Sequence, residues 1–281
     1  MKNFLQNINE LILFKHSIFS LPFIFIAMII SADGWFGWEL LLLGTLSAIS
    51  ARNFAMAFNR YLDIDHDSVN PRTKNRPSVD GRLSKKSILT FTLLNGLGFI
   101  LIAYFVNLTA FYLSFPILII LASYSYFKRF SYLAHIILGI SLGLAPIAGV
   151  VAVQESIPLW SLFLSAGVIF WVAGFDLLYS LQDIDFDKKF GLHSIPSKFG
   201  VKRTFQISAF FHFLTPIFWG LAIFEAELGI FSQIAVIFAI LMLAYEHYLV
   251  HKDFKKIDKA FFTVNGYLGI IFFIFIILEK V

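Results

Sequence analysis

A run of oxygen-bearing side chains at fixed spacing, in the segment 59–67, ends a long apolar stretch of the sequence. Asn59, Asp63 and Asp67 stand four residues apart, so on a helix all three side chains share one face. Carboxylates this close repel one another unless a cation or basic groups neutralise them. The spacing therefore favours metal binding over three merely solvated loop residues.

The same pattern returns later in the chain, again after an apolar stretch. Residues 183–187 read Asp-Ile-Asp-Phe-Asp, and residues 63–67 read Asp-Ile-Asp-His-Asp. Two clusters of hard oxygen donors suit Mg²⁺, which takes few protein oxygens and shares its remaining positions with phosphates. The repeat favours binding of a divalent cation, and the rest of the chain decides where the two clusters lie.

Composition places these clusters in a membrane protein. Of the 281 residues 58% are hydrophobic and 14% charged, with a mean hydropathy of +0.79, whereas soluble domains are roughly half apolar and about a quarter charged. The sequence has no cysteine, which excludes a thiolate nucleophile and a Cys-based metal site. Lys15 and His16 interrupt the first apolar stretch, so we expect an uncleaved first helix rather than a signal peptide.

A membrane-spanning helix needs about 20 mainly apolar residues. Nine segments meet this measure, with limits near 17–32, 38–60, 87–106, 108–127, 132–153, 157–181, 203–224, 228–250 and 260–279. With the N-terminus in the cytoplasm, every Lys and Arg except Arg52 and Lys280 falls on the cytoplasmic side, as the positive-inside rule demands. We predict an all-α, polytopic membrane protein with nine transmembrane helices, a cytoplasmic N-terminus and one domain over residues 1–281.

Both acidic clusters then lie on the cytoplasmic side, at the ends of the second and sixth spans. An offset of four spans indicates a parallel repeat, and hence two four-helix halves followed by a ninth helix. The clusters begin the two longest connections, at about 61–86 and 182–202. Connections of that length are usually functional or mobile.

Basic residues accompany the acidic clusters. Arg72 and Arg76 follow the first cluster, Lys128 and Arg129 end the fourth span, and Lys188 follows the second cluster. Basic groups next to metal-binding carboxylates suit a diphosphate held through Mg²⁺. The positive-inside bias accounts for many cytoplasmic Lys and Arg residues without any ligand, so both interpretations stay open at this point.

Charged residues inside a span are costly and usually face a cavity or a partner. Arg52, Asp176 and Glu246 are such residues. Arg52 and Asp176 each stand seven residues before the first member of a cluster, two turns back on the same helical face. They either pair with each other or contact a substrate. His135 lies near a cytoplasmic helix end, where packing or hydrogen bonding is the commoner role.

These motifs resemble those of the UbiA superfamily of intramembrane aromatic prenyltransferases. The similarity runs from His16 to about Gly200 and rests on Asn59-x3-Asp63-x3-Asp67, Arg72-Thr-x2-Arg76-Pro, Tyr126-x-Lys128-Arg129 followed by Leu138-Gly139, and Tyr179-x3-Asp183-x-Asp185-x-Asp187. The resemblance implies nine helices, a Mg²⁺-bound polyprenyl diphosphate at the cytoplasmic mouth, and transfer of the polyprenyl group to the ring of an aromatic acid such as 4-hydroxybenzoate. The partners it implies are these two substrates and the lipid bilayer, with no nucleic acid.

The resemblance also implies roles for single residues. Asp63, Asp67, Asp183 and Asp187 would be catalytic and, with Asn59, would bind two Mg²⁺ ions. Arg72, Arg76 and Lys128 would hold the diphosphate, with Arg129, Lys188 and Tyr179 beside them. Arg52 would bind the carboxylate of the acceptor, with Asp176 and His135 near it.

The chain departs from the family pattern at two places. Arg60 stands where the family often has Asp, and Ala134-His135 replaces the Pro-Gln typical of 4-hydroxybenzoate enzymes. The diphosphate motifs are intact, but the acceptor stays open between 4-hydroxybenzoate in ubiquinone synthesis and a naphthoate acid in menaquinone synthesis. A cation-coupled transporter is the alternative from another class, although it would place its carboxylates nearer mid-membrane. A bacterial protein of this kind would lie in the inner membrane, with its active site facing the cytoplasm.

Overall fold

A computed structural model describes residues 2–12 and 21–281 of the protein, and its regular elements in these ranges are all helical. Eight helices there are long and apolar enough to cross a membrane, and α2 (Leu21–Ala32) is a shorter apolar helix. The prediction of an all-α polytopic membrane protein is confirmed. The first predicted span, 17–32, begins among residues outside the described ranges, so the ninth crossing stays a prediction.

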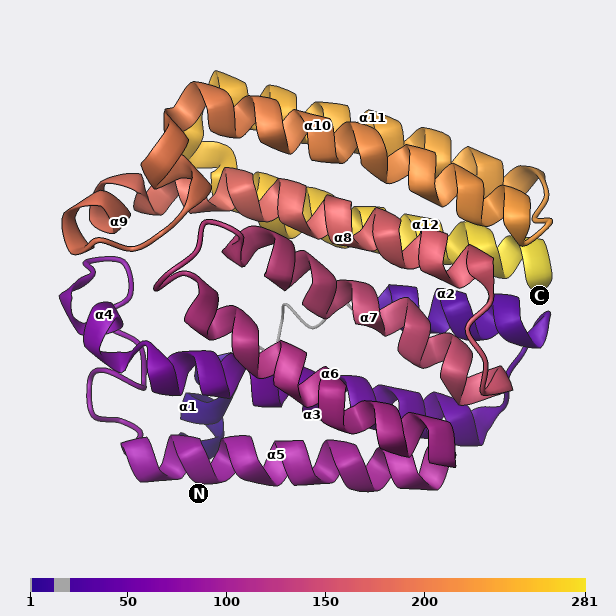
Figure 1. The fold of residues 1–281 in the computed structure, drawn as a ribbon, viewed down its shortest axis with the longest axis horizontal. Helices are drawn as coiled ribbons and strands as arrows, with labels where there is room; N and C mark the ends of the chain where they lie inside the picture. Colours follow the sequence, from indigo (N-terminus) through magenta and orange to yellow (C-terminus); the bar gives the residue numbers. More distant parts are fainter. Residues whose placement is uncertain (1, 13–20) are drawn as a thin grey trace.

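The long helices run side by side along the horizontal axis of Figure 1. Polar caps begin several of them: Ser84, Asn107 and Ser194 each accept a hydrogen bond from a backbone N–H of the first turn that follows. The long elements are α3 (Trp38–Leu62), α5 (Lys85–Val106), α6 (Leu108–Phe127), α7 (Ala134–Gln154), α8 (Leu159–Tyr179), α10 (Ile195–Glu225), α11 (Ile230–Lys252) and α12 (Asn265–Lys280).

The two acidic segments form short helices at one end of the bundle, where the sequence predicted loops. α4 (Ile64–Val69) follows α3, and α9 (Ile184–Phe190) follows α8 through a 3-10 turn; both lie at the left of Figure 1. The break falls on an aspartate each time, with φ/ψ of −89°/4° at Asp63 and −104°/6° at Asp183. The same backbone break after the second and sixth predicted spans agrees with a parallel repeat.

Three further boundaries differ from the prediction. α10 begins at Ile195 rather than near 203, because Gly200 (φ 76°) lets the chain turn between a short helical start and the long apolar helix. The ninth predicted span, 260–279, begins with a π-helical turn before α12. An N-terminal helix, α1 (Lys2–Ile12), was not predicted because it is too short to span a membrane. Its last turns pack on α3 and α5.

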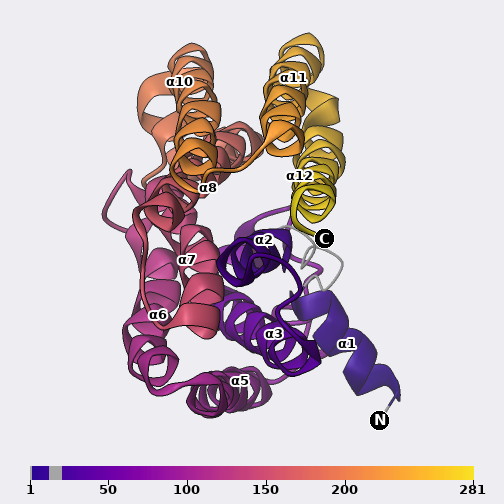
Figure 2. The same cartoon turned by 90° about the vertical axis from the view of Figure 1, so that its right-hand side faces the viewer.

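Close packing holds α7 and α10 against α8, as the end-on view of Figure 2 shows. Glycines allow this approach: a Cβ at Gly139 of α7 would lie 2.4 Å from the backbone oxygen of Ile169, and one at Gly167 of α8 would lie 2.2 Å from the ring of Trp219. Inside a membrane the hydrophobic effect does not drive helices together, and small residues at the contact let them pack closely. α7 and α8 therefore present their polar side chains at a well-defined separation.

Candidate active site

A cavity of about 480 Å³ opens between the helices and contains most of the predicted site residues in its wall. Both acidic clusters line one end of it. Along α3 its lining runs from Asp63 back to Ser47, which at 1.5 Å per residue is a depth of about 24 Å. The deeper wall is mostly apolar, with Ala48, Leu121 and Leu142 among its residues. The cavity is thus charged at its mouth and apolar in its depth.

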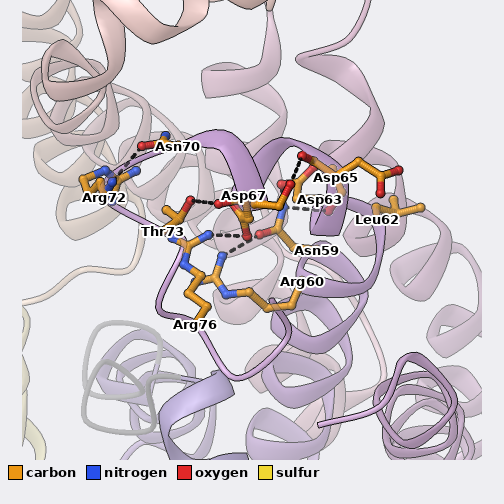
Figure 3. Close-up of polar contacts among 12 residues, drawn as sticks. Asn59, Arg60, Leu62, Asp63, Asp65, Asp67, Asn70, Arg72, Thr73 and Arg76 are labelled. Carbon is orange, nitrogen blue, oxygen red and sulfur yellow. Dashed lines mark hydrogen bonds and ion pairs between the residues drawn. The ribbon is translucent and has the colours of Figure 1, made fainter. Parts of the chain in front are cut away.

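The first acidic cluster is buried and held by basic side chains. Asn59, Asp63 and Asp67 are 8%, 1% and 7% exposed. Asn59 donates from Nδ2 to Oδ2 of Asp63 at 3.0 Å, and Nζ of Lys128 pairs with the same carboxylate. Arg76 donates to Oδ2 of Asp67 at 2.6 Å (Figure 3). All three side chains line the cavity, although the helix on which the spacing placed them is broken at Asp63.

Arg60 takes part in this cluster, although its charge departs from the family pattern. Its Nη1 donates to Oδ1 of Asn59 at 3.0 Å, as Figure 3 shows, and its side chain lines the cavity. This bond occupies the amide oxygen, so the Asn59 NH₂ group faces Asp63. The substitution thus adds a cation beside the carboxylates instead of a further acid.

The second cluster is tied to the loop that follows the first. Arg72 donates two hydrogen bonds to Asp183, from Nε to Oδ1 at 3.0 Å and from Nη2 to Oδ2 at 2.6 Å. Its Nη1 also donates to the hydroxyl of Tyr179 at 3.2 Å. Burial lowers the pKa of Arg72, but the hydrogen bond and the charge of Asp183 outweigh it and hold the pKa above its usual value. Asp187 accepts a hydrogen bond from Oγ of Ser194 at 2.6 Å. Both repeats thus contribute to one site.

Three further predicted residues lie deeper in the cavity wall: Arg52, His135 and Asp176. Nδ1 of His135 lies 2.7 Å from Oδ2 of Asp176, so the partner of this acid is a histidine of α7. Arg52 donates from Nη1 to the backbone oxygen of Ile12 at 2.9 Å. These three ionisable groups inside the bundle thus face a cavity, which is the usual arrangement for a binding site within a membrane.

The model of the UbiA prenyltransferase family matches residues 20–277 of this sequence. The chain belongs to this family. It is 30% identical over 244 residues to a 4-hydroxybenzoate octaprenyltransferase of Janthinobacterium sp. (strain Marseille), which covers 86% of this chain and 85% of that protein. A protein of the same name from Francisella tularensis subsp. novicida (strain U112) is 25% identical over 255 residues, covering 91% and 89%. The resemblance inferred from the motifs is confirmed.

Solved structures of other UbiA homologues share the fold. The apo structure of a homologue from Aeropyrum pernix K1 superposes with a TM-score of 0.84 and 30% identity, covering 94% of this chain and 97% of that one. A homologue from Archaeoglobus fulgidus, bound to GPP and Mg²⁺, gives a TM-score of 0.79 at 21% identity, covering 97% and 99%. This chain is therefore a prenyltransferase, and family membership decides against the transporter alternative.

The predicted diphosphate-binding residues of this prenyltransferase divide into two groups. Arg72, Arg76, Lys128 and Tyr179 line the cavity. Arg129 donates to the backbone oxygen of Leu62 at 2.7 Å and reaches the Asp63 carboxylate at only 3.5 Å. Lys188 lies on the exposed side of α9. The cavity wall, within the described part of the chain, contains neither Arg129 nor Lys188.

Sequence reasoning missed several residues that hold the carboxylates in place. Asn70 is buried and donates from Nδ2 to Oδ1 of Asp183 at 3.4 Å, while Oγ1 of Thr73 donates to the backbone oxygen of Asp67 at 3.0 Å. Ser194 supports Asp187 and also caps α10. A signal was present for Ser194, because Ser-x-Pro-Ser is a typical helix start. For Asn70 and Thr73 the sequence carried no such signal apart from the nearby Pro71.

Proposed function

We propose that this prenyltransferase moves a polyprenyl group from polyprenyl diphosphate to the ring of an aromatic carboxylic acid of the 4-hydroxybenzoate type, as a Mg²⁺-dependent step of quinone biosynthesis. The observation that carries the proposal is a cavity about 24 Å deep that has both acidic clusters at its mouth and a mostly apolar wall in its depth. A polyprenyl diphosphate has the same division into an anionic head and a long apolar tail. The names of the curated relatives support the acceptor class.

The side-chain oxygens at the mouth of the cavity are of the type that Mg²⁺ binds. Carboxylate and amide oxygens from both clusters line one cavity, and Mg²⁺ commonly binds one or two carboxylates together with substrate phosphates. Among the described residues no three acidic or histidine side chains stand close enough to hold an ion by themselves. We infer that the phosphate groups of the polyprenyl diphosphate complete the metal site, so the ion and the polyprenyl diphosphate bind together. The residues that would hold the ions are Asn59, Asp63, Asp67, Asp183 and Asp187.

The basic residues that neutralise these acids would then turn to the diphosphate. Lys128, Arg76 and Arg72 pair with Asp63, Asp67 and Asp183 respectively, and all three basic side chains line the cavity. With ions at the carboxylates, the three basic side chains would be available to hydrogen-bond the diphosphate oxygens. When bound, Mg²⁺ acts as a Lewis acid that stabilises the negative charge building on the leaving group.

The allylic cation left behind needs shielding from water and an attacking ring. Aromatic faces attract cations, and several aromatic residues line the cavity, among them Tyr124, Phe175, Tyr179, Phe261 and Phe262. Arg52 would bind the acceptor carboxylate. The carbon–oxygen bond to diphosphate breaks first, a ring carbon of the acceptor then forms the new bond to the allylic cation, and loss of the ring proton restores aromaticity.

The experiment is a prenylation assay in membranes with a polyprenyl diphosphate, Mg²⁺ and either 4-hydroxybenzoate or 1,4-dihydroxy-6-naphthoate. We expect prenylated 4-hydroxybenzoate, with activity lost on adding EDTA and restored by excess Mg²⁺. Product from the naphthoate alone would move the enzyme to menaquinone synthesis, and no product from either acid would overturn the proposal. Protease accessibility of a tag at the N-terminus tests the accompanying inference that this end and the acidic clusters face the cytoplasm, as the Lys and Arg distribution favours.

A further inference from the structure

The wall of the cavity holds a histidine nitrogen that has no hydrogen-bond partner. Among the buried side-chain polar atoms of the described residues that lack a partner, those on cavity-lining residues are Nε2 of His135 and Nδ1 of His193. A buried polar atom left unsatisfied destabilises the fold, so each such atom in a native structure requires an explanation. His193 belongs to the loop beside Lys128 at the mouth, whereas His135 lies further in, beside Asp176.

The contact with Asp176 decides what the free nitrogen of His135 can do. Nδ1 of His135 lies 2.7 Å from Oδ2 of Asp176, and an ionised carboxylate only accepts hydrogen bonds. Nδ1 therefore carries the hydrogen, and in the neutral ring Nε2 holds a lone pair and accepts. A bonded carboxylate commonly fixes a histidine tautomer in this way. His135, a residue of the cavity wall, thus carries a buried hydrogen-bond acceptor of defined tautomer.

The position of this acceptor is fixed by helix packing. His135 is 5% exposed and lies in the first turn of α7, while Asp176 lies near the end of α8. The two helices are in close contact one turn further along, where Gly139 packs on the backbone of Ile169. Neither ring nor carboxylate belongs to a loop. A ligand group that meets Nε2 therefore meets it at one place.

We propose that Nε2 of His135 accepts a hydrogen bond from a hydroxyl group of the aromatic acceptor, and so selects phenolic acceptors. This inference rests on the proposed function. Asp176 is the positioning residue, because it holds the ring in the tautomer that accepts. With Arg52 on the acceptor carboxylate, the two contacts define both ends of a hydroxy acid. A hydroxyl that donates to imidazole also gives its ring more electron density at the adjacent carbons, where electrophilic attack on a phenol takes place.

The test compares His135→Leu, which removes the acceptor atom, with His135→Gln, whose side-chain oxygen can still accept. We expect His135→Leu to raise KM for 4-hydroxybenzoate about tenfold, the effect of losing one hydrogen bond to a ligand, and to leave KM for the polyprenyl diphosphate unchanged. His135→Gln should restore most of the loss. The matched control is His251→Leu, which changes an exposed histidine of α11 outside the cavity wall. Thermal unfolding in detergent shows that the variants are folded.

A second acceptor-like probe separates hydrogen bonding from shape. 4-Fluorobenzoate keeps the carboxylate but has no O–H to donate, so its inhibition constant should be the same in the wild-type enzyme and in His135→Leu. The preference for the hydroxy acid should therefore shrink about tenfold in the variant. An unchanged preference, or a failure of His135→Gln to restore activity while it is folded, would overturn the assignment. If the wild-type enzyme prenylates neither acid, the proposed function fails and this inference falls with it.

Discussion

Two regions of this molecule hold ionisable side chains inside the helix bundle, and their surroundings differ. The first is the cavity, where acids, Arg72, Arg76 and Lys128 line an open space. The second, which we call the C-terminal network, consists of buried and partly buried residues from α8, α10, α11 and α12 that bond to one another: Trp171, His212, Glu246, His247 and Asn265.

The C-terminal network is a chain of short bonds. Trp171 donates from Nε1 to Oδ1 of Asn265 at 2.7 Å, and Asn265 donates from Nδ2 to Oε1 of Glu246 at 2.9 Å. The rings of His212 and His247 lie in contact beside it, with Nδ1 and Nε2 3.0 Å apart. Within the described residues no member of the network lines the cavity. A charged residue within a membrane span thus indicates a ligand site only where its side chain also lines a cavity.

The largest effect on turnover should come from removing a carboxylate of the cavity. We expect Asp63→Ala and Asp183→Ala each to lower kcat by about 10²–10³-fold or more, because each deletes electrostatic stabilisation of the leaving group. Prenylation assays on purified enzyme measure this, with thermal unfolding as a check on folding. Asp258→Ala is the matched control, because Asp258 is an exposed acid that accepts a hydrogen bond from Gln182 and lies outside the cavity wall. Full activity of either cavity variant would remove the metal assignment.

A smaller and more selective effect is expected at Arg52. Arg52→Ala should raise KM for the carboxylated acceptor by about 10–100-fold, which corresponds to the loss of a charged hydrogen bond, and should change KM for the donor much less. The readout is the ratio of the two constants from initial rates. Arg82→Ala serves for comparison, because Arg82 is an exposed arginine paired with Glu10 and Asp80. An equal rise in both constants would show that Arg52 supports the fold and not the acceptor.

The smallest effect on turnover should come from the C-terminal network. Asn265→Ala leaves Nε1 of Trp171 and Oε1 of Glu246 without their partner, and should lower the free energy of unfolding by about 1–3 kcal/mol. Activity per folded molecule should stay unchanged. Denaturant titration in detergent measures this loss of stability. The control is Lys280→Ala, which removes the partly exposed ion pair with Asp33 and should lower the free energy of unfolding by less than about 1 kcal/mol. A drop in activity at full stability would mean that the network does take part in the reaction.

The comparison also shows where sequence reasoning reached its limit. Arg52, Asp176 and Glu246 looked alike as charged residues within apolar runs. Two of them line the cavity, whereas Glu246 is 1% exposed inside a closed network. Some predicted helix boundaries were wrong because they depend on contacts with the rest of the bundle. Charged stretches were taken as loops, yet residues 64–69 and 184–190 form helices against the bundle end.

The sequence by itself determined the membrane class, the long helices, the family motifs and the proximity of Asn59 to Asp63. These features depend on run length and on the spacing of residues one helical turn apart, which are local properties. Only the tertiary structure decided which distant groups meet. Arg72 reaches Asp183 across 111 residues, Lys128 reaches Asp63 across 65, and His135 reaches Asp176 across 41. These meetings depend on how α3, α7 and α8 pack, through contacts such as that of Gly139 with Ile169, and no periodicity within one segment specifies them.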